Sequence, residues 1–253
     1  MPMTMVVVPT YNERENLPLL VEALWKLPVE DLQLLVVDDN SPDGTGRLAD
    51  ELAAQHPGRI HVLHRKEKAG LGPAYRAGFR VALASGADYV IQMDCDFSHD
   101  PKYLPALIAA ADSGADVVLG SRYAKGGSVD HDWPIYRKLL SGFANLVYVR
   151  TILRVPFRDS TGGFRLWRAQ TVIGLDLDRL RSNGYVSQVE LAYITYKLGY
   201  RTVEVPIHFP ERQRGTSKMN MRIQLEAAVR VWQIWSRHHR LNPSMRRSEP
   251  YSL

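Results

Sequence analysis

The chain has 253 residues, 45% of them hydrophobic, which suits one large domain or two small ones with an ordinary packed core. Its single cysteine, Cys95, excludes an internal disulfide and fits a reducing compartment. The net charge of +5 is unevenly distributed, because residues 1–120 carry 10 Lys and Arg against 17 Asp and Glu, whereas residues 121–253 carry 22 against 10. We therefore expect the acidic half to hold a cation and the basic half to meet an anionic partner.

The sequence favours a cytoplasmic protein whose contact with a membrane is at most peripheral. Its start, Met1-Pro2-Met3-Thr4, lacks the basic and apolar segment of a secretory signal. The uncharged run over residues 139–149 is roughly half of the ~20 residues that a helix needs to span a bilayer.

Strands and helices alternate along the first half of the chain. Short apolar runs predict strands at residues 3–9, 32–37, 60–64, 88–93 and 115–120. Helical patterns lie between them, at about residues 16–27, 45–55, 73–85 and 101–113. This alternation predicts an α/β fold with a mostly parallel sheet and helices on both faces.

The second half differs in character. Helices are expected at residues 135–153 and 187–198, an alternating strand at 201–207, a basic flexible loop at 210–218 and a further helix at 219–237. Residues 238–253 predict a basic tail with little to fold around. We expect a main domain over residues 1–220, followed by an amphipathic helix and tail over residues 221–253.

Both of the amphipathic helices carry an apolar stripe. The first stripe consists of Ile135, Leu139, Phe143, Leu146 and Val147. The second consists of Met221, Leu225, Ala228, Val229, Trp232 and Trp235, with arginines on the opposite face. The second stripe could pack against the core or lie on a membrane surface, and the sequence leaves both alternatives open.

Polar clusters follow three of the predicted strands, at residues 11–13, 38–39 and 94–96. The carboxyl ends of parallel strands meet at one edge, where open α/β sheets bind ligands. Asp94 and Asp96 would point the same way in an extended chain, and two carboxylates with free coordination positions suit Mg²⁺ or Mn²⁺ bound to a diphosphate. The alternative is a solvated turn. Since the chain has no glycine-rich phosphate loop, carboxylates, an aromatic ring and a metal would have to hold a nucleotide.

Seven motifs, in this order, resemble the inverting nucleotide-sugar glycosyltransferases of family 2 with a GT-A fold, and more narrowly the dolichol- or polyprenol-phosphate mannosyltransferases. They are Val8-Pro9-Thr10-Tyr11-Asn12-Glu13, Val37-Asp38-Asp39-Asn40-Ser41-Pro42-Asp43-Gly44-Thr45, Lys68-Ala69-Gly70-Leu71-Gly72-Pro73-Ala74-Tyr75, Asp94-Cys95-Asp96-Phe97-Ser98-His99, Gly120-Ser121-Arg122-Tyr123, Thr161-Gly162-Gly163-Phe164-Arg165 and Glu211-Arg212 with Lys218. Together they cover residues 3–220.

The resemblance implies a donor site for GDP-mannose. The residues implied in binding the nucleotide are Pro9, Tyr11, Glu13, Asp38, Asp39, Lys68, Cys95, Arg212 and Lys218. Among them, Arg212 and Lys218 would close over the diphosphate from the loop at 210–218. Asp94, Asp96 and Ser98 would hold Mg²⁺ or Mn²⁺ on that diphosphate.

The resemblance also implies that Arg122 and Arg137 bind the phosphate of a polyprenyl phosphate and act with Asp94 and Asp96 in catalysis. A phosphate monoester has a second pKa near ~6 and is largely a dianion at neutral pH, so no general base would be required. The expected partners are therefore GDP-mannose, polyprenyl phosphate and the cytoplasmic face of a membrane. A membrane-anchoring protein is a further candidate partner.

Two rival functions remain at this point. The nearer one is an enzyme of the same fold that uses UDP-glucose or another nucleotide sugar. A nucleic-acid-binding module would explain the basic half, but it would leave Asp94 and Asp96 unexplained and lacks aromatic residues interleaved through a basic groove. We therefore expect no nucleic-acid partner.

Overall fold

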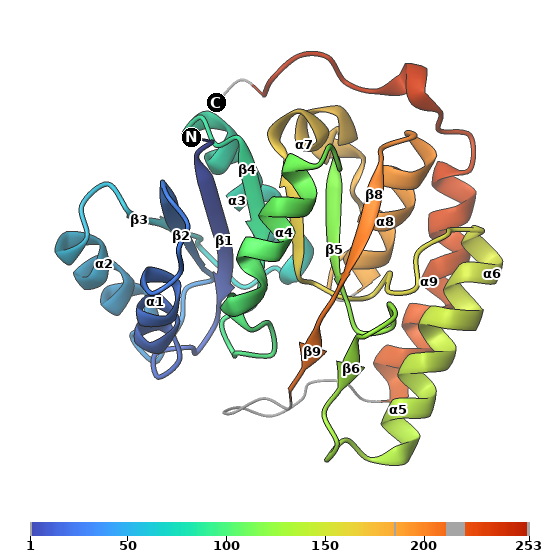
Figure 1. The fold of residues 1–253 in the computed structure, drawn as a ribbon, viewed down its shortest axis with the longest axis horizontal. Coiled ribbons are helices and arrows are strands. Elements are labelled where there is room, and N and C mark those ends of the chain that lie inside the picture. Colours follow the sequence, from blue (N-terminus) through green and yellow to red (C-terminus); the bar gives the residue numbers. More distant parts are fainter. Residues whose placement is uncertain (1, 185, 211–220, 252–253) are drawn as a thin grey trace.

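The computed structural model of the chain describes residues 2–184, 186–210 and 221–251, without the side chains of residues 221–227. Its main sheet has seven strands in the order β3-β2-β1-β4-β7-β5-β8 (Figure 1). They are β1 (Thr4–Thr10), β2 (Leu32–Asp38), β3 (Ile60–His64), β4 (Tyr89–Gln92), β5 (Val117–Ser121), β7 (Arg165–Arg168) and β8 (Thr202–Pro206). Neighbouring strands are parallel except that β7 is antiparallel to both β4 and β5. The predicted mostly parallel sheet is confirmed, and β7 is a strand that the sequence analysis missed.

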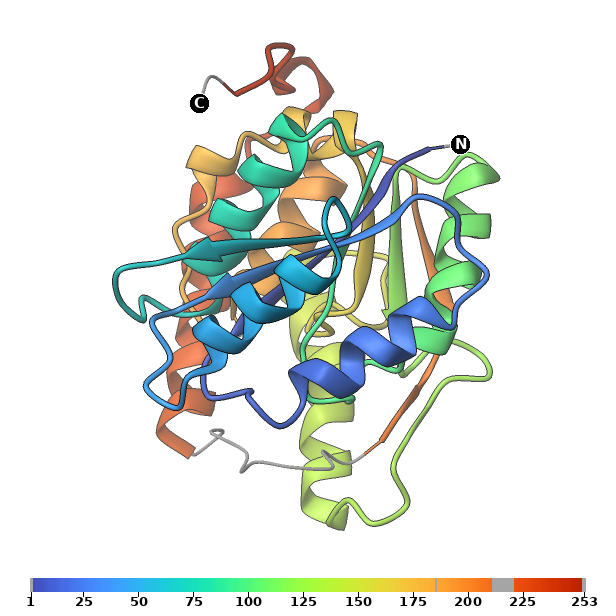
Figure 2. The same cartoon turned by 90° about the vertical axis from the view of Figure 1, so that its left-hand side faces the viewer.

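Helices cover both faces of this sheet, as predicted (Figure 2). One face packs α1 (Leu17–Trp25), α2 (Thr45–Gln55) and α4 (Leu104–Asp112). The other packs α3 (Leu71–Ala84), α7 (Ala169–Leu175), α8 (Val186–Lys197) and α9 (Met221–His238). Because side chains alternate along a strand, β1 sends Met5 and Val7 into one core and Val6 and Val8 into the other. Burial on both faces explains why the four residues between Thr4 and Pro9 are all apolar.

A small parallel pair, β6 (Ser128–Val129) and β9 (His208–Phe209), lies beyond the carboxyl ends of the parallel strands, close to α5 (Ile135–Gly142) (Figure 1). The helix predicted at 135–153 begins with α5, continues through a π-helical segment, η2 (Phe143–Val149), and ends with α6 (Arg150–Leu153). The segment that holds β6, α5 and η2 therefore lies beyond the carboxyl edge of the parallel strands.

The apolar stripes of these helices are exposed. The exposed fractions are 75% for Ile135 and 68% for Leu139 on α5, and 54% for Phe143 on η2. On α9, Trp232 is 55% exposed, whereas Val231 and Ile234 enter the core. Of the two alternatives left open for the stripe on α9, core packing therefore does not hold for Val229, Trp232 and Trp235, because Val231 and Ile234 are the residues that enter the core.

The tail after α9 is also better packed than the sequence analysis expected. The guanidinium of Arg246 donates to the carbonyl oxygens of Leu198 and Gly199 at 2.9 and 2.8 Å, beyond the end of α8. The backbone N–H of Arg247 donates to Gly174 O at 3.2 Å, and the hydroxyl of Tyr251 accepts from the N–H of Leu177. The tail thus runs along the end of the sheet away from β6 and β9, where exposed carbonyls supply acceptors for its arginines (Figure 1). The predicted lack of packing is wrong.

None of the helices in the described part of the chain combines the length and apolar character that a bilayer-spanning segment needs. The expected domain boundary at residue 220 lies outside the described residues, and α9 shares the core that lines one face of the sheet.

The packing of α3 on the sheet gives a stability prediction. A Cβ at Gly78 would lie 2.4 Å from Val7 Cγ1 and 3.0 Å from Val37 Cγ2, so Gly78→Ala should lower the free energy of unfolding by about 1–3 kcal/mol. Gly142→Ala is the matched control, because nothing lies within 4 Å of its added Cβ and alanine should stabilise the helix by about 0.5–1 kcal/mol. Urea denaturation measures both, and equal effects of the two changes would contradict this packing.

Candidate active site

The acidic residues after β4 lie in a loop, where they are fixed by nearby hydrogen bonds. Since β4 ends at Gln92, the predicted alternation of an extended strand does not set their directions. Asp96 is buried, and its Oδ1 accepts from the N–H and hydroxyl of Ser98 at 3.1 and 2.5 Å. The side chain of Asp94 is 26% exposed, and its Oδ1 accepts from the hydroxyl of Tyr75 at 3.1 Å.

His99 shapes the same loop from beneath. Its Nδ1 accepts the backbone N–H of Asp94 at 2.9 Å, so that ring nitrogen carries no proton. The buried ring stacks on Phe164 with a centroid distance of 5.2 Å. His99 is therefore a structural support of the Asp94 backbone, which agrees with its interpretation from the sequence as a loop hydrogen-bonding residue and not a metal ligand.

The oxygen donors of this loop fit a hard divalent cation such as Mg²⁺ or Mn²⁺. In the part of the chain that the structure describes, no three His, Cys, Asp or Glu side chains gather as a metal site. A cation held by Asp94 and Asp96 would thus draw further oxygens from a bound diphosphate, as the sequence analysis expects. Ser98 is fully buried with its hydroxyl on Asp96, and its part in metal binding stays a prediction.

Cys95 is placed differently from its neighbours in the loop. Its thiol is 2% exposed and packs in an apolar core cluster, where burial raises its pKa well above the ordinary value. The side chain is therefore a core group, and the predicted contact of Cys95 with the donor stays a prediction.

Several of the predicted nucleotide residues lie at the end of β1 or in the loops that follow β1, β2 and β3. The Nζ of Lys68 lies 3.6 Å from the centroid of the Tyr11 ring, which brings two of them together from separate loops. The carboxylate of Asp39 is buried and accepts from Nη1 of Arg65 at 2.6 Å; burial raises the pKa of Asp39, and Arg65 opposes that rise. Pro9 is half-buried beside them on β1.

Asp38 and Glu13 have structural partners in the same region. Both oxygens of the buried Asp38 accept hydrogen bonds, from the Thr10 hydroxyl at 3.0 Å and from the N–H and hydroxyl of Ser41 at 3.0 and 2.5 Å. Asp38 therefore joins the ends of β1 and β2. The carboxylate of Glu13 accepts from the Asn16 side chain at 2.7 Å, just before α1 begins.

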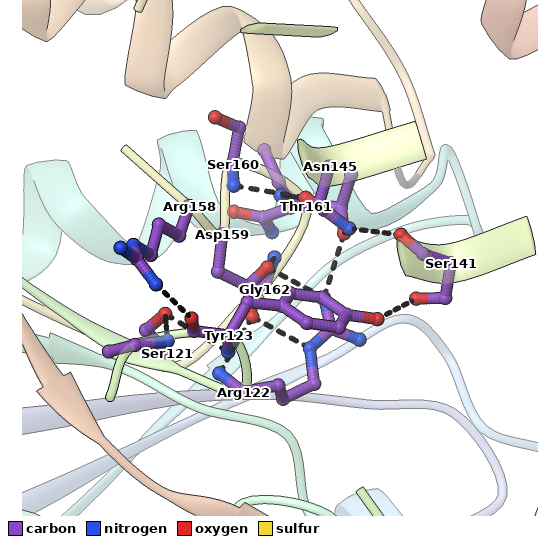
Figure 3. A network of polar contacts seen from close by, with 12 residues as sticks. Ser121, Arg122, Tyr123, Ser141, Asn145, Arg158, Asp159, Ser160, Thr161 and Gly162 are labelled. Atoms are coloured by element: carbon purple, nitrogen blue, oxygen red, sulfur yellow. Dashed lines mark hydrogen bonds and ion pairs between the residues drawn. The ribbon is translucent and has the colours of Figure 1, made fainter. Parts of the chain in front are cut away.

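Arg122, at the end of β5, forms a buried ion pair with Asp159. Nε and Nη2 of Arg122 donate to the two carboxylate oxygens, both at 2.7 Å (Figure 3). Burial alone would raise the pKa of Asp159, but Arg122 and two backbone N–H groups lower it below its ordinary value. The predicted phosphate-binding arginine is thus held in one orientation by a carboxylate that the sequence analysis did not single out.

An aromatic bridge connects Arg122 to the other predicted arginine, Arg137. The guanidinium carbon of Arg122 lies 5.2 Å from the Phe209 ring, and that of Arg137 lies 3.7 Å from the Trp133 ring. The two rings meet edge to face at 5.7 Å, and Phe209 makes a similar contact with His99 at 5.7 Å. This bridge places both arginines on one cluster that also touches the loop of Asp94 and Asp96.

Sequence analysis missed Trp133 and Phe209. The spacing of Trp133 and Arg137, four residues apart at the start of a helix, was the available signal. Arg212 and Lys218, the predicted lid residues, lie outside the described residues.

The family model described as glycosyl transferase family 2 matches residues 5–178, more than half of the chain. The chain belongs to glycosyl transferase family 2. It is therefore an enzyme that transfers glycosyl groups, as the sequence analysis predicted.

This glycosyltransferase has well-matched curated relatives. It is 47% identical over 236 residues to polyprenol monophosphomannose synthase of Mycolicibacterium smegmatis, covering 92% of this chain and 88% of the relative. It is 48% identical over 227 residues to undecaprenyl-phosphate mannosyltransferase of Micrococcus luteus, covering 90% and 91%. A dolichol-phosphate mannosyltransferase of Pyrococcus furiosus is 36% identical over 232 residues, which cover 90% of this chain and 62% of that one.

Solved structures confirm the fold of this glycosyltransferase. Glucosyl-3-phosphoglycerate synthase from Mycobacterium tuberculosis, crystallised with Mg²⁺ and UDP, superposes with a TM-score of 0.65 at 18% identity, covering 94% of this chain and 80% of that one. A second structure of that enzyme, with Mn²⁺, UDP and glucosyl-3-phosphoglycerate, gives a TM-score of 0.63 at 19% identity, with coverage of 94% and 80%. At this identity the likeness concerns the fold alone.

The Arg122–Asp159 pair gives a second stability prediction. Asp159→Ala leaves a buried guanidinium uncompensated and should lower the free energy of unfolding by about 3–5 kcal/mol. Asp178→Ala, which breaks the exposed pair of Arg80 and Asp178, should cost less than about 1 kcal/mol. Because the folded-state pKa of Asp159 is depressed, its contribution is present above pH ~4 and is lost as the pH falls through the folded-state value. Denaturation at neutral and acid pH measures this, and a loss for Asp159→Ala no larger than that of the control would contradict it.

Proposed function

We propose that this glycosyltransferase transfers mannose from GDP-mannose to a polyprenyl phosphate, giving polyprenyl-phosphate mannose and GDP with inversion at the anomeric carbon. The observation that carries the proposal is the identity of 47% and 48%, over about nine tenths of the chain, to relatives named for this kind of transfer. The geometry of the site supports it, because donor and acceptor functions have separate residues at one edge of the sheet.

On the donor side, Tyr11 and Lys68 would hold the nucleoside, with Pro9, Glu13 and Asp39 beside them. Asp94 and Asp96 would hold Mg²⁺ or Mn²⁺, which supplies charge neutralisation for the departing diphosphate. Fixed hydrogen bonds from Tyr75 and Ser98 orient the two carboxylates before any ligand binds. Arg212 and Lys218 would add positive charge from the loop at 210–218.

On the acceptor side, an oxygen of the lipid phosphate would attack the anomeric carbon of mannose. The new carbon–oxygen bond forms as the bond from that carbon to the diphosphate breaks, and GDP leaves with the electron pair. The attacking oxygen is already anionic, so the protein needs to position it rather than remove a proton. Arg122, held by Asp159, and Arg137, stacked on Trp133, are the residues that would do so.

The lipid chain and the membrane would meet the exposed apolar side chains of α5, η2 and α9. Ile135 and Leu139 lie in the same helix as Arg137, so an isoprenoid chain there would leave its phosphate near the arginine. A hydroxyl of Tyr148 donates to Ala228 O at 3.0 Å and ties η2 to α9. This exposed apolar surface supports peripheral binding to a membrane, which we propose takes place at the cytoplasmic face.

Donor and acceptor can be tested together with purified protein, Mg²⁺ or Mn²⁺ and a short polyprenyl phosphate. We expect labelled mannose to enter the lipid fraction from GDP-mannose, and no comparable transfer of glucose from UDP-glucose. Transfer of glucose alone would show that UDP-glucose, and not GDP-mannose, is the sugar donor. Transfer of neither sugar would contradict the proposed function.

The cation prediction concerns Asp96. Asp96→Asn keeps the shape of the side chain but removes a charged ligand, so it should nearly abolish transfer and weaken binding of GDP in Mg²⁺ by about ten- to a hundredfold. Asp100→Asn, in the same loop, is the control, because Asp100 is engaged with Lys102. Calorimetry with and without chelator measures the binding. Equal affinity of Asp96→Asn and wild type in Mg²⁺ would count against the site.

The membrane prediction concerns α9. Trp232→Glu places a charge on the exposed apolar face, whereas Gln233→Glu places the same charge on an exposed polar position of the same helix. Trp232→Glu should lower activity on anionic vesicles several-fold more than activity in detergent. Sedimentation with vesicles measures binding directly. If both variants bound vesicles as the wild type does, α9 would have no part in membrane contact.

A further inference from the structure

Thr161, in the loop before β7, is part of the hydrogen-bond network around Arg122, and its neighbours restrict how its hydroxyl can bond. Its hydroxyl oxygen accepts from Nη2 of Arg122 at 2.7 Å and from Nδ2 of Asn145 at 2.9 Å (Figure 3). The other end of the Asn145 amide faces the loop backbone, because its Oδ1 accepts from the N–H groups of Ser160 and Thr161, both at 3.1 Å. Guanidinium and amide nitrogens can only donate, so both contacts use lone pairs of the hydroxyl.

A hydroxyl whose two lone pairs are occupied has only its proton left to offer. Among the described residues, the Thr161 hydroxyl donates to no protein acceptor. Thr161 is half-buried, whereas Asn145 and Asp159 behind it are each 1% exposed. The proton is therefore directed away from Arg122 and Asn145, toward the more open side of the loop.

We infer that Thr161 is a further binding residue for the acceptor, donating its hydroxyl proton to a phosphate oxygen that Arg122 also attracts. The inference rests on the proposed function, since it takes the acceptor to be a phosphate. The hydrogen-bonding groups at this place suit such a ligand, because arginine and a hydroxyl with both lone pairs occupied can donate hydrogen bonds but cannot accept them. Phosphate oxygens only accept, whereas a sugar hydroxyl also needs an acceptor for its own proton.

The π-helical segment η2 explains how Thr161 is held. Asn145, in η2, points into the protein and binds the loop at residues 160–161, and Nδ2 also donates to Ser141 O at 3.0 Å. The next residues, Leu146 and Val147, are 40% and 49% exposed on the apolar surface. The segment η2 therefore holds Thr161, whose hydroxyl we infer binds the phosphate. It also carries part of the surface proposed for the lipid chain.

The test compares Thr161→Val with Thr161→Ser. Valine has nearly the shape of threonine and keeps the backbone N–H that binds Asn145, but it lacks the hydroxyl; serine restores it. Thr195→Val is the matched control, because the buried Thr195 hydroxyl donates to Leu191 O inside α8, away from the site. Thermal midpoints of all variants, KM for GDP-mannose and for polyprenyl phosphate, and the Kd of farnesyl phosphate are measured.

We expect Thr161→Val to raise KM for polyprenyl phosphate and the Kd of farnesyl phosphate by about ten- to a hundredfold. KM for GDP-mannose should stay within about twofold, and Thr161→Ser should recover most of the loss. Unchanged farnesyl phosphate binding in Thr161→Val would overturn the inference. So would a parallel rise of both KM values with a lowered midpoint, since that pattern marks a purely structural role.

The farnesyl phosphate measurement separates this inference from the proposed function, because binding needs no sugar transfer. If the wild type binds farnesyl phosphate through Thr161 but transfers no mannose, the donor proposal fails and the inference stands. If the wild type transfers mannose and Thr161→Val binds farnesyl phosphate normally, the inference alone fails.

Discussion

The buried ion pair of Arg122 and Asp159 organises the acceptor half of the site. It joins the end of β5 to the loop before β7, and the antiparallel direction of β7 is what brings that loop to the carboxyl edge of the parallel strands. Arg165, the first residue of β7, supports the same loop from the core by donating to the carbonyls of Ser160 and Gly162 at 2.8 and 2.9 Å. Burial lowers its pKa to about 10, so it stays charged at neutral pH. An inserted antiparallel strand thus supplies a rigid base for a polar loop.

This rigidity suits a reaction in which positioning matters more than proton transfer. The acidic loop after β4 and the basic cluster around Arg122 are connected through His99 and Phe209, so the two charged regions have a fixed separation. In the proposed reaction, this separation of the cation site and the phosphate site would align the attacking oxygen with the departing diphosphate. In the sequence, the residues of the proposed cation site belong to the acidic first half of the chain, and the arginines of the proposed phosphate site belong to the basic second half.

Local signals predicted the parallel strands, their helices and the polar residues that follow them, because apolar runs and turn residues act over a few positions. The strand β7 was missed because its four residues form a strand only by pairing with β4 and β5. The aromatic bridge joins Trp133 to Phe209, a contact that no local pattern contains. The packing of the tail depends on the carbonyls of Leu198 and Gly199, and exposure of Trp232 depends on which face of α9 meets the core. Tertiary contacts also determine that Asp38 joins the ends of two strands, whereas Asp94 stays partly exposed.

The most direct test of the central claim, a single displacement by a phosphate oxygen, is the anomeric configuration of the product. The one-bond coupling between C1 and H1 of the mannose in the purified lipid can be measured by NMR after transfer from ¹³C-labelled GDP-mannose. The account predicts the configuration opposite to that of the donor. A product with the donor's configuration would contradict it, since retention requires a second displacement or a different route at the anomeric carbon.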